Sequence, residues 1–239
     1  IIKYFFKALI AFLGIYYVLE KIDLGEVFKI FQELDIVLVF ISFVFLCASQ
    51  FISSFRMRYY IQINGRDISS FDSLSIYMQS CFFNIVFPGG MGGDALKVLT
   101  ISKKCSFTKL DALRIGLSER SNGLFALIML LIFLCCVSNN FISFELYILV
   151  ILFVFVATTT IYFLFAQTFL KENLYISMCA LKYSLTVQIL CFLSAIIIFS
   201  AIGISPIYNI NELIDYAIIY SLSSIVSILP ITIGGAGLR

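Results

Sequence analysis

The sequence predicts an all-α, polytopic membrane helix bundle with two re-entrant segments that are broken by Pro and Gly. Of the 239 residues, 62% are hydrophobic and only 13% are charged, whereas soluble domains are close to half apolar and a quarter charged. Several uncharged runs reach the roughly 20 residues that a helix needs to cross about 30 Å of hydrocarbon. Two apolar segments are interrupted by Pro and Gly and then meet a charged residue. We expect a single membrane domain over residues 1–239.

The uncharged runs define the predicted spans. The first and weakest span lies between Lys3 and Glu20, where Lys3 and Lys7 can snorkel to the interface. The longer uncharged runs cover residues 36–55, 73–93, 121–144, 146–170, 183–211 and 216–238. Each of them is long enough for a membrane helix, so the chain is expected to be multi-pass.

The distribution of basic residues predicts the orientation, because Lys and Arg mark cytoplasmic loops. The two lysines near the start of the chain place the N-terminus in the cytoplasm, and the acidic connection at residues 20–35 is expected outside. Two basic clusters, at residues 56–66 and 97–114, are both expected in the cytoplasm. They flank the uncharged run 73–93, and an ordinary span there would put them on opposite sides of the membrane.

A re-entrant segment at residues 73–93 removes this conflict. It enters as a helix, turns and leaves on the same side, and its non-helical turn must then line protein or a water-filled cavity. We expect the breaks at Pro88, Gly89, Gly90, Gly92 and Gly93. Close helix packing is the other interpretation of these glycines. A break is favoured, because a proline with four glycines seriously weakens a helix.

The last residues of the chain, 229–239, read LPITIGGAGLR and repeat this pattern. Here we expect the breaks at Pro230, Gly234, Gly235 and Gly237. Paired interrupted segments in the two halves of a transporter indicate an inverted repeat, with the substrate site between the breaks. The repeat halves would be residues 1–114 and 115–239.

Charged residues follow the first break at once. Asp94 is a good N-cap for a helix over residues 95–102. It is also placed to contact a ligand, because the free N–H groups of the turn, the helix N-terminus and Lys97 together favour an anionic group. Both roles stay open at this point.

Four further charged residues lie at predicted membrane edges. Glu119 and Arg120 begin one span, and Arg56 and Arg58 end another. Anchoring at the interface is one explanation for all four. The functional alternative is that Glu119 pairs with Lys97 across a site and that the arginines bind a phosphate headgroup. As edge residues, Lys97 and Arg120 are expected to contribute little to stability.

Other chemistries find little support in the sequence. There is no histidine, the seven cysteines lie mostly in apolar runs and no Cys-x-x-Cys occurs, so neither a metal site nor a disulfide framework is expected. Gly90-x-Gly92-x-x-Ala95 fits the dinucleotide fingerprint only formally, because an apolar run of membrane length precedes it instead of a strand. We expect no cofactor, and a net charge of +2 gives no reason to expect a nucleic-acid partner.

Four motifs, in order along the chain, resemble those of a membrane family. They are Asn84-x-x-x-Pro88, Gly93-Asp94-x-x-Lys97, Glu119-Arg120-x-x-Gly123-Leu124, and Pro230 with Gly234-Gly-x-Gly-Leu-Arg239. Together they resemble the lysylphosphatidylglycerol synthase transmembrane region, a flippase-like domain family of bacteria and archaea. The chain departs from this family where Asp94 and Lys97 replace the more usual Glu and Arg, and where Ser121 and Asn122 replace apolar residues.

The resemblance implies a multi-pass protein of the bacterial or archaeal cytoplasmic (inner) membrane that moves a lipid between leaflets. In the best-known members the cargo is an aminoacylated phosphatidylglycerol, which a separate soluble domain synthesises. No such domain is present in this sequence, so we do not expect synthase activity, and a separate lipid-modifying enzyme is the implied partner. Because the chain starts without Met and the family often continues with Glu after Arg239, we expect the natural protein to be longer.

The expected function is translocation of a phospholipid or a polyprenyl-phosphate-linked lipid. More than half of the 16 Lys and Arg residues lie between Arg56 and Arg120, which suits capture of a lipid with an anionic or phosphate headgroup from the cytoplasmic leaflet. The rival is a membrane-embedded transferase that adds a sugar or an amino acid to a lipid carrier, with Asp94 or Glu119 as the general base. The expected substrate-binding residues are Arg56, Arg58, Asn84, Asp94, Lys97, Glu119, Arg120 and Arg239.

Overall fold

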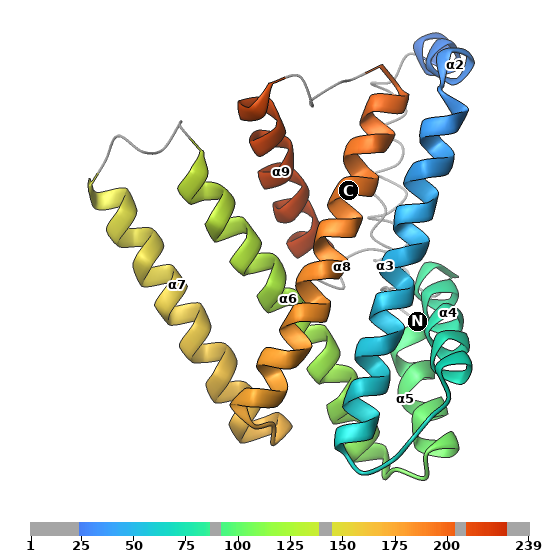
Figure 1. Cartoon of the computed structure of the whole chain (residues 1–239), viewed down its shortest axis with the longest axis vertical. Helices are drawn as coiled ribbons and strands as arrows, with labels where there is room; N and C mark the ends of the chain where they lie inside the picture. The colour runs from blue at the N-terminus through green and yellow to red at the C-terminus, as the bar shows by residue number, and fades with distance from the viewer. Residues whose placement is uncertain (1–23, 87–91, 139–144, 204–208, 229–239) are drawn as a thin grey trace, which may run out of the picture.

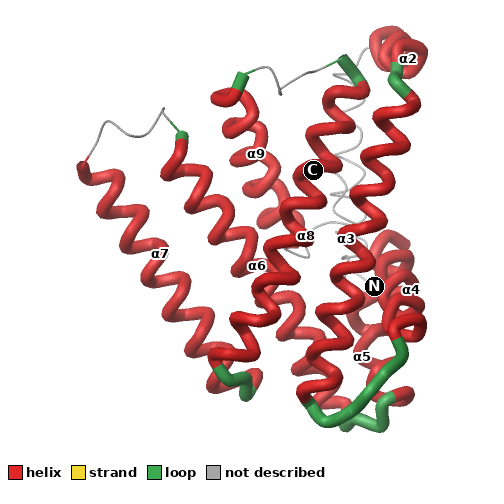
Figure 2. Tube along the Cα trace, viewed as in Figure 1, coloured by secondary structure: helices red, strands yellow, loops and turns green. Residues whose placement is uncertain are grey.

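The computed structural model describes residues 24–86, 92–138, 145–203 and 209–228, and these ranges consist of helices joined by short loops (Figures 1 and 2). The helices are α2 (Leu24–Glu33), α3 (Ile36–Ile63), α4 (Ser70–Val86), α5 (Gly92–Lys104), α6 (Lys109–Val137), α7 (Glu145–Phe165), the short π-helix η1 (Ala166–Leu170), α8 (Leu174–Ala201) and α9 (Ile210–Ile228). Within these ranges, four segments are long and apolar enough to cross a membrane: α3, α6, Leu149–Leu170 and α8. The predicted all-α, multi-pass fold is confirmed.

The helix α3 begins where its uncharged run begins, because Asp35 caps it. The Asp35 carboxylate accepts hydrogen bonds from the amides two and three residues further on, at 2.9 and 3.3 Å. The helix does not end with the uncharged run but continues to Ile63. Arg56 and Arg58, which were expected to end the span, therefore lie inside the helix. The turn that follows contains Gly65, whose φ of +76° favours glycine.

The helices α3 and α8 form a closely packed antiparallel pair. The hydroxyls of Ser42 and Ser194 each donate a hydrogen bond to the backbone carbonyl of the other residue, at 2.8 and 3.0 Å. At one end of the pair, the Asp35 amide donates to the Ala201 carbonyl at 3.1 Å. Small polar residues allow membrane helices to approach this closely. The pair forms a wall against which α4 and α6 pack.

The helices α4 and α5 form an antiparallel hairpin next to α3 and α6 (Figure 1). At the base of the hairpin, Lys104 Nζ lies 2.6 Å from Asp72 Oδ1. At its tip, the Gly93 amide donates a hydrogen bond to Asn84 Oδ1 at 2.9 Å. Gly93 lies so close to α4 that a Cβ added there would overlap the backbone carbonyl of Ser80. The two helices can meet at the tip only because Gly93 has no side chain.

Gly92 and Gly93 are helical, which corrects the expectation that they belong to the break. The helix α5 begins at Gly92. For Gly93 the other interpretation of the glycines, close helix packing, is the one that the structure supports, because Gly93 packs against α4. Asp94 consequently lies in the first turn of α5 and not at its N-cap. Residues 88–90 lie outside the described residues, so the break itself stays a prediction.

The start of α4 and the end of α5 lie at the same end of the bundle. Arg66 lies in the loop before α4, and Lys103 lies in the last turn of α5. The ion pair between Asp72 and Lys104 holds these two segments together. Both basic clusters thus have members at the base of the hairpin, as a re-entrant segment requires, while the entry of the hairpin into the membrane stays a prediction.

Several other predictions also concern parts of the chain that the structure does not describe. The N-terminal span at residues 3–20 is one of them. The second break is another, with Pro230, Gly234, Gly235 and Gly237. The expected boundary between the repeat halves, at residues 114–115, falls inside α6, and the repeat itself stays a prediction.

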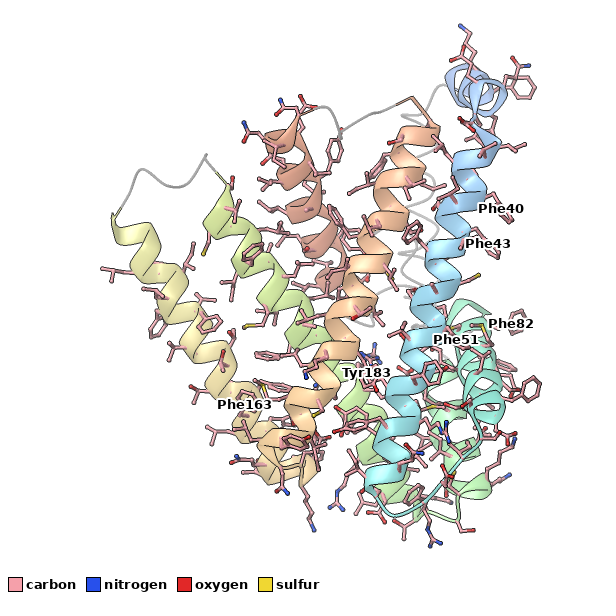
Figure 3. The ribbon with its side chains drawn as sticks, viewed as in Figure 1. Phe40, Phe43, Phe51, Phe82, Phe163 and Tyr183 are labelled. Carbon is pink, nitrogen blue, oxygen red and sulfur yellow. The ribbon has the colours of Figure 1, made fainter. Side chains whose placement is uncertain are left out.

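The outer faces of the bundle are strongly apolar. Phe40 and Phe43 project outward from α3 and Phe82 projects outward from α4 (Figure 3), with exposed fractions of 65%, 58% and 61%. Exposed apolar surface on this scale suits contact with lipid and not with water. In a bundle with such an exterior, the charged side chains lie in the loops or between the helices.

Candidate functional site

Five of the predicted site residues lie together between α3, α5 and α6, and we call them the charged cluster: Arg56, Asp94, Lys97, Glu119 and Arg120. Lys97 Nζ lies 3.1 Å from Glu119 Oε2, and Arg120 Nη1 lies 2.9 Å from Asp94 Oδ2. Arg56 Nε is 3.9 Å from Glu119 Oε1, and Lys97 Nζ is 3.8 Å from Asp94 Oδ1. The tertiary fold thus joins three helices through one set of charges.

The helix geometry explains how these side chains converge. Asp94 and Lys97 are three residues apart on α5 and share one face. Glu119 and Arg120 are neighbours on α6 and diverge: the Glu119 side chain is 3% exposed, whereas the Arg120 side chain is 32% exposed. Because α6 begins at Lys109, both lie well inside the helix and not at its start as expected. The Glu119 side chain therefore points into the bundle, and the Arg120 side chain lies at the partly exposed edge of the cluster.

The burial and the charge balance of the cluster favour an anionic ligand. Lys97, Glu119 and Arg56 are 6%, 2% and 6% exposed. Three cationic and two anionic side chains leave a net charge of +1. Removing charges from water is costly, and ionisable groups inside membrane proteins commonly mark binding or transport sites. An anion would neutralise the excess positive charge.

Two buried polar atoms of the cluster have no hydrogen-bond partner in the described part of the chain. They are Arg56 Nε and Glu119 Oε1. Their separation of 3.9 Å is too long for a direct hydrogen bond. Buried donors without partners are rare in native proteins and often indicate a water, an ion or a ligand. The guanidinium N–H is a strong donor to a carboxylate or phosphate oxygen.

A cavity of about 270 Å³ lies beside the cluster, between α3, α4, α5, α6 and α8. Its polar lining outside the cluster consists of Gln50, Ser53, Tyr77 and Gln188. Lys97 Nζ lies 4.6 Å from the centre of the Tyr77 ring, a cation–π contact. These four residues could not be predicted from the sequence, because a single Gln, Ser or Tyr in an apolar helix does not indicate which face it occupies.

A hydrogen-bonded chain leads from the cluster along α6 and α8. Arg56 Nη1 donates to Ser184 Oγ at 2.7 Å, and Ser184 Oγ donates to Asn122 Oδ1. Asn122 Nδ2 donates to the Tyr162 hydroxyl at 2.7 Å and to the Ser177 carbonyl at 3.1 Å. Asn122 is fully buried. Asn122 follows Ser121 at the start of the uncharged run 121–144, and its polar side chain is the sequence signal that points to this chain.

The other three predicted site residues do not join the cluster. Asn84 binds the amide at the start of α5 and so takes the capping role that was expected of Asp94. Arg58 turns toward the start of α4, where its Nη1 donates to Ser70 Oγ at 2.7 Å. Arg239 lies beyond the residues that the structure describes.

The chemistry that this site offers is ionic recognition. No group of three or more His, Cys, Asp or Glu side chains that could hold a metal ion occurs within the described ranges. The side chains present are an ammonium, two guanidinium groups, two carboxylates and neutral amides and hydroxyls. Guanidinium groups bind phosphate and carboxylate oxygens through their fixed N–H geometry, and an ammonium adds a compact positive charge.

Comparison with known proteins supports a membrane assignment. A family model described as the lysylphosphatidylglycerol synthase TM region matches residues 4–178, which is well over half of the 239 residues. The matched range contains the whole charged cluster, the α4–α5 hairpin and Asn122. No curated protein and no solved structure matches the chain.

Proposed function

Because the chain belongs to the lysylphosphatidylglycerol synthase transmembrane family, we propose that it is a lipid translocator that binds its cargo at the charged cluster. The cargo is a phospholipid or a polyprenyl-phosphate-linked lipid with an anionic headgroup. The membrane is the cytoplasmic membrane of a bacterium or an archaeon, with the N-terminus in the cytoplasm. The observation that carries this proposal is Arg56 Nε, a buried donor that lacks a hydrogen-bond partner in the described part of the chain and belongs to a cluster of net positive charge.

A phosphate headgroup matches the cavity in charge and in hydrogen bonding. Arg56 uses Nη1 to bind Ser184, which orients the guanidinium group and leaves Nε for a ligand. Lys97 and Arg120, which line the same cavity, supply the positive charge. Gln50 and Gln188 in the wall can donate or accept further hydrogen bonds.

The headgroup enters the site at the more exposed ion pair of the cluster, Arg120 with Asp94. Arg120 and Asp94 have side chains 32% and 36% exposed, and pairs this accessible contribute little to stability. An incoming phosphate can therefore replace the Asp94 carboxylate on Arg120 at small cost. The buried pair of Lys97 and Glu119 stays in place meanwhile, and the lipid tails remain in the bilayer against the apolar outer faces.

The arrangement of the shorter helices is consistent with such a path. The hairpin of α4 and α5 occupies the lower half of the bundle in Figure 1, and α9 occupies the upper half. Non-helical backbone inside a membrane protein needs a polar or protein-lined space around it. The second predicted break follows α9 in the sequence and is the expected counterpart of the hairpin from the opposite side.

A transferase would need one of the two carboxylates as its general base. Asp94 is bound by Arg120 at 2.9 Å and Glu119 is bound by Lys97 at 3.1 Å. Carboxylates that are held by cations in this way suit recognition of a charged headgroup better than removal of a proton from a substrate. We therefore favour translocation.

Reconstitution of the purified chain into liposomes separates the two functions. The vesicles carry phosphatidylglycerol with a fluorescent label that dithionite quenches only in the outer leaflet. A translocator increases the quenched fraction above that of protein-free vesicles and of vesicles with heat-denatured protein, and the extracted lipid is chemically unchanged. Quenching that equals these controls, together with a new lipid product formed from an added sugar or aminoacyl donor, would replace the proposal by the transferase.

A further inference from the structure

A second cavity lies apart from the charged cluster. It has a volume of about 300 Å³, lies between α3, α6, η1 and α8, and shares no lining residue with the cavity beside the cluster. Its polar lining includes Tyr60, Asn64, Asp111, Arg114, Ser118 and Glu172. We call it the Glu172 cavity.

The Glu172 cavity contains a buried carboxylate that forms no ion pair in the described ranges. Glu172 is only 9% exposed, and its Oε2 accepts a hydrogen bond from Ser177 Oγ at 2.9 Å. Its Oε1 has no hydrogen-bond partner among the described residues. Arg114, the arginine of this cavity, is paired with Asp111 at 3.2 Å. Lys171 also lines the cavity, but no ion pair joins it to Glu172 in the described ranges, so Glu172 is a buried carboxylate without a paired cation.

A second oxygen in the cavity is also unpartnered. Tyr60 is 1% exposed, and its hydroxyl has no hydrogen-bond partner in the described ranges. Two buried oxygens without partners, in one enclosed space, represent a desolvation cost that a native protein normally offsets with a bound group. Since both oxygens can accept and one is a carboxylate, the group that fits them is positively charged.

We propose that the Glu172 cavity is a binding site for a monovalent cation, H⁺ or Na⁺, held by Glu172 and Tyr60. A proton would bind Glu172 Oε1, giving a neutral carboxyl group whose O–H can donate to the Tyr60 hydroxyl. Na⁺ would bind the same two oxygens, with Ser118 Oγ and Asn64 Oδ1 as further oxygen ligands. A single unmatched negative charge neutralises one positive charge, and a divalent ion would need more carboxylates than the one available.

The site is connected to the charged cluster by hydrogen bonds. Ser177, whose hydroxyl binds Glu172, also accepts a hydrogen bond from Asn122 at its backbone carbonyl. Asn122 and Ser184 continue the chain to Arg56. Occupation of the cavity can therefore change the position of the arginine that we assign to the headgroup, and this coupling, unlike the cation site itself, rests on the proposed function.

The titration of Glu172 gives the direction of the expected pH dependence. Burial raises the pKa of Glu172 above its ordinary value, and the hydroxyls of Ser118 and Ser177 lower it by less. The other charged and polar groups that face this cavity are Tyr60 and Asn64 from α3, Asp111 and Arg114 from α6, and Lys171 beside Glu172. Because the pKa is higher in the folded than in the unfolded chain, stability falls as pH rises from the unfolded value to the folded value, and then levels off.

Thermal unfolding of the purified chain in detergent tests the cation site without any lipid. In choline chloride, the Tm of the native chain should fall by at least about 2 °C from about pH 4 to about pH 8, because the proton is lost. If Na⁺ is the ligand, replacing choline by Na⁺ at the higher pH should restore the Tm by a similar amount. If the ligand is a proton alone, Na⁺ and choline should give the same Tm.

Three variants make this test decisive. Glu172→Gln should abolish the pH-dependent part of the Tm and any effect of Na⁺, and Tyr60→Phe should weaken the Na⁺ effect while the protein stays folded. Glu33→Gln is the matched control, because this carboxylate is exposed on α2 and does not line the cavity, and it should keep both dependences. The proposal is overturned if Glu172→Gln titrates like the native chain and Tyr60→Phe responds to Na⁺ like the native chain.

Liposomes with a pH or Na⁺ gradient extend the test to transport. Lipid movement by the native chain should respond to the gradient that matches the ligand, and movement by Glu172→Gln should not respond to either. An absence of lipid movement in every variant would contradict the proposed function while leaving the Tm result intact. The two failures are therefore distinguishable.

Discussion

At the scale of single residues, the charged cluster combines two kinds of ion pair. Lys97 and Glu119 have side chains 8% and 3% exposed, whereas Arg120 and Asp94 have side chains 32% and 36% exposed. Removal of one partner from a buried pair leaves an uncompensated charge, but an exposed pair contributes only about 0–1 kcal/mol. The structure places Lys97 in a buried ion pair inside the bundle, so we now expect a larger contribution to stability from Lys97 than from Arg120, and both contributions stay predictions.

The buried pair gives the first prediction at this scale. Lys97→Ala should lower the free energy of unfolding by up to about 3–5 kcal/mol, because Glu119 then stays buried with only the Arg56 guanidinium, 3.9 Å away, as its counter-charge. The paired replacement Lys97→Met/Glu119→Gln removes both charges and should recover more than half of this loss. Thermal unfolding of the purified variants measures both effects. Equal losses in the single and the paired variant would show that the charge pairing is not the cause.

The sequence indicated the charged members of the site and missed its uncharged members. Charges are rare in an apolar chain, so each of them is informative, and five of the eight predicted residues do lie together. Ser184 and Tyr162 look like many other residues of their type, and only the tertiary contact with Asn122 distinguishes them. Glu172 stands beside Lys171 in what reads as a short loop, and nothing in the sequence indicates that the turn after η1 buries it.

At the scale of the elements, the uncharged runs predicted which segments are helical but not where the helices end. The helix α3 continues to Ile63 and α6 begins at Lys109, each about two to three turns beyond its uncharged run. The run marks the length of helix that suits the hydrocarbon. The helix itself continues beyond the run where the charged side chains that follow form ion pairs or hydrogen bonds with other helices. Such contacts depend on the tertiary structure and cannot be predicted from the run alone.

The tip of the hairpin gives a prediction about packing. Gly93→Ala should destabilise the protein by about 1–3 kcal/mol, because the added methyl group overlaps the Ser80 carbonyl and the two helices must separate. Gly123→Ala is the matched control, since a Cβ there would be 3.5 Å from Arg56 Nη1, an ordinary contact. A native Tm in Gly93→Ala would argue against the close approach of α4 and α5.

The base of the hairpin gives a prediction about topology. Accessibility tags placed at Arg66 and at Lys103 should report the same, cytoplasmic side of the membrane, because the Asp72–Lys104 pair joins the two segments. Labelling of intact cells and of inverted vesicles by a membrane-impermeant reagent reads out the side. Labelling from opposite sides would rule out a re-entrant hairpin and make residues 73–93 an ordinary span.

At the scale of the whole molecule, an apolar exterior surrounds an interior in which a hydrogen-bonded chain of polar residues runs beside an apolar core. One cavity lies at the charged cluster and another at Glu172, and Asn122 lies on the hydrogen-bonded chain between them. The approach of the two predicted breaks, at Pro88 and Pro230, and the inverted repeat concern residues that the structure does not describe, and they stay predictions. Neither could be decided from sequence, because Pro and Gly show where a helix stops and not what the end of the helix meets.

The central claim is that the charged cluster holds the lipid headgroup, and the comparison of two arginines in the liposome assay tests it most directly. Arg120 and Arg58 are both partly exposed, at 32% and 29% of the side chain, and each forms an ion pair with an aspartate. Only Arg120 lines the cavity beside the cluster. Arg120→Ala should slow the movement of labelled phosphatidylglycerol about tenfold or more, because a charge-assisted hydrogen bond to the headgroup is lost, whereas Arg58→Ala should move lipid at close to the native rate. Equal rates in the native chain and both variants, with all three equally folded, would contradict the assignment.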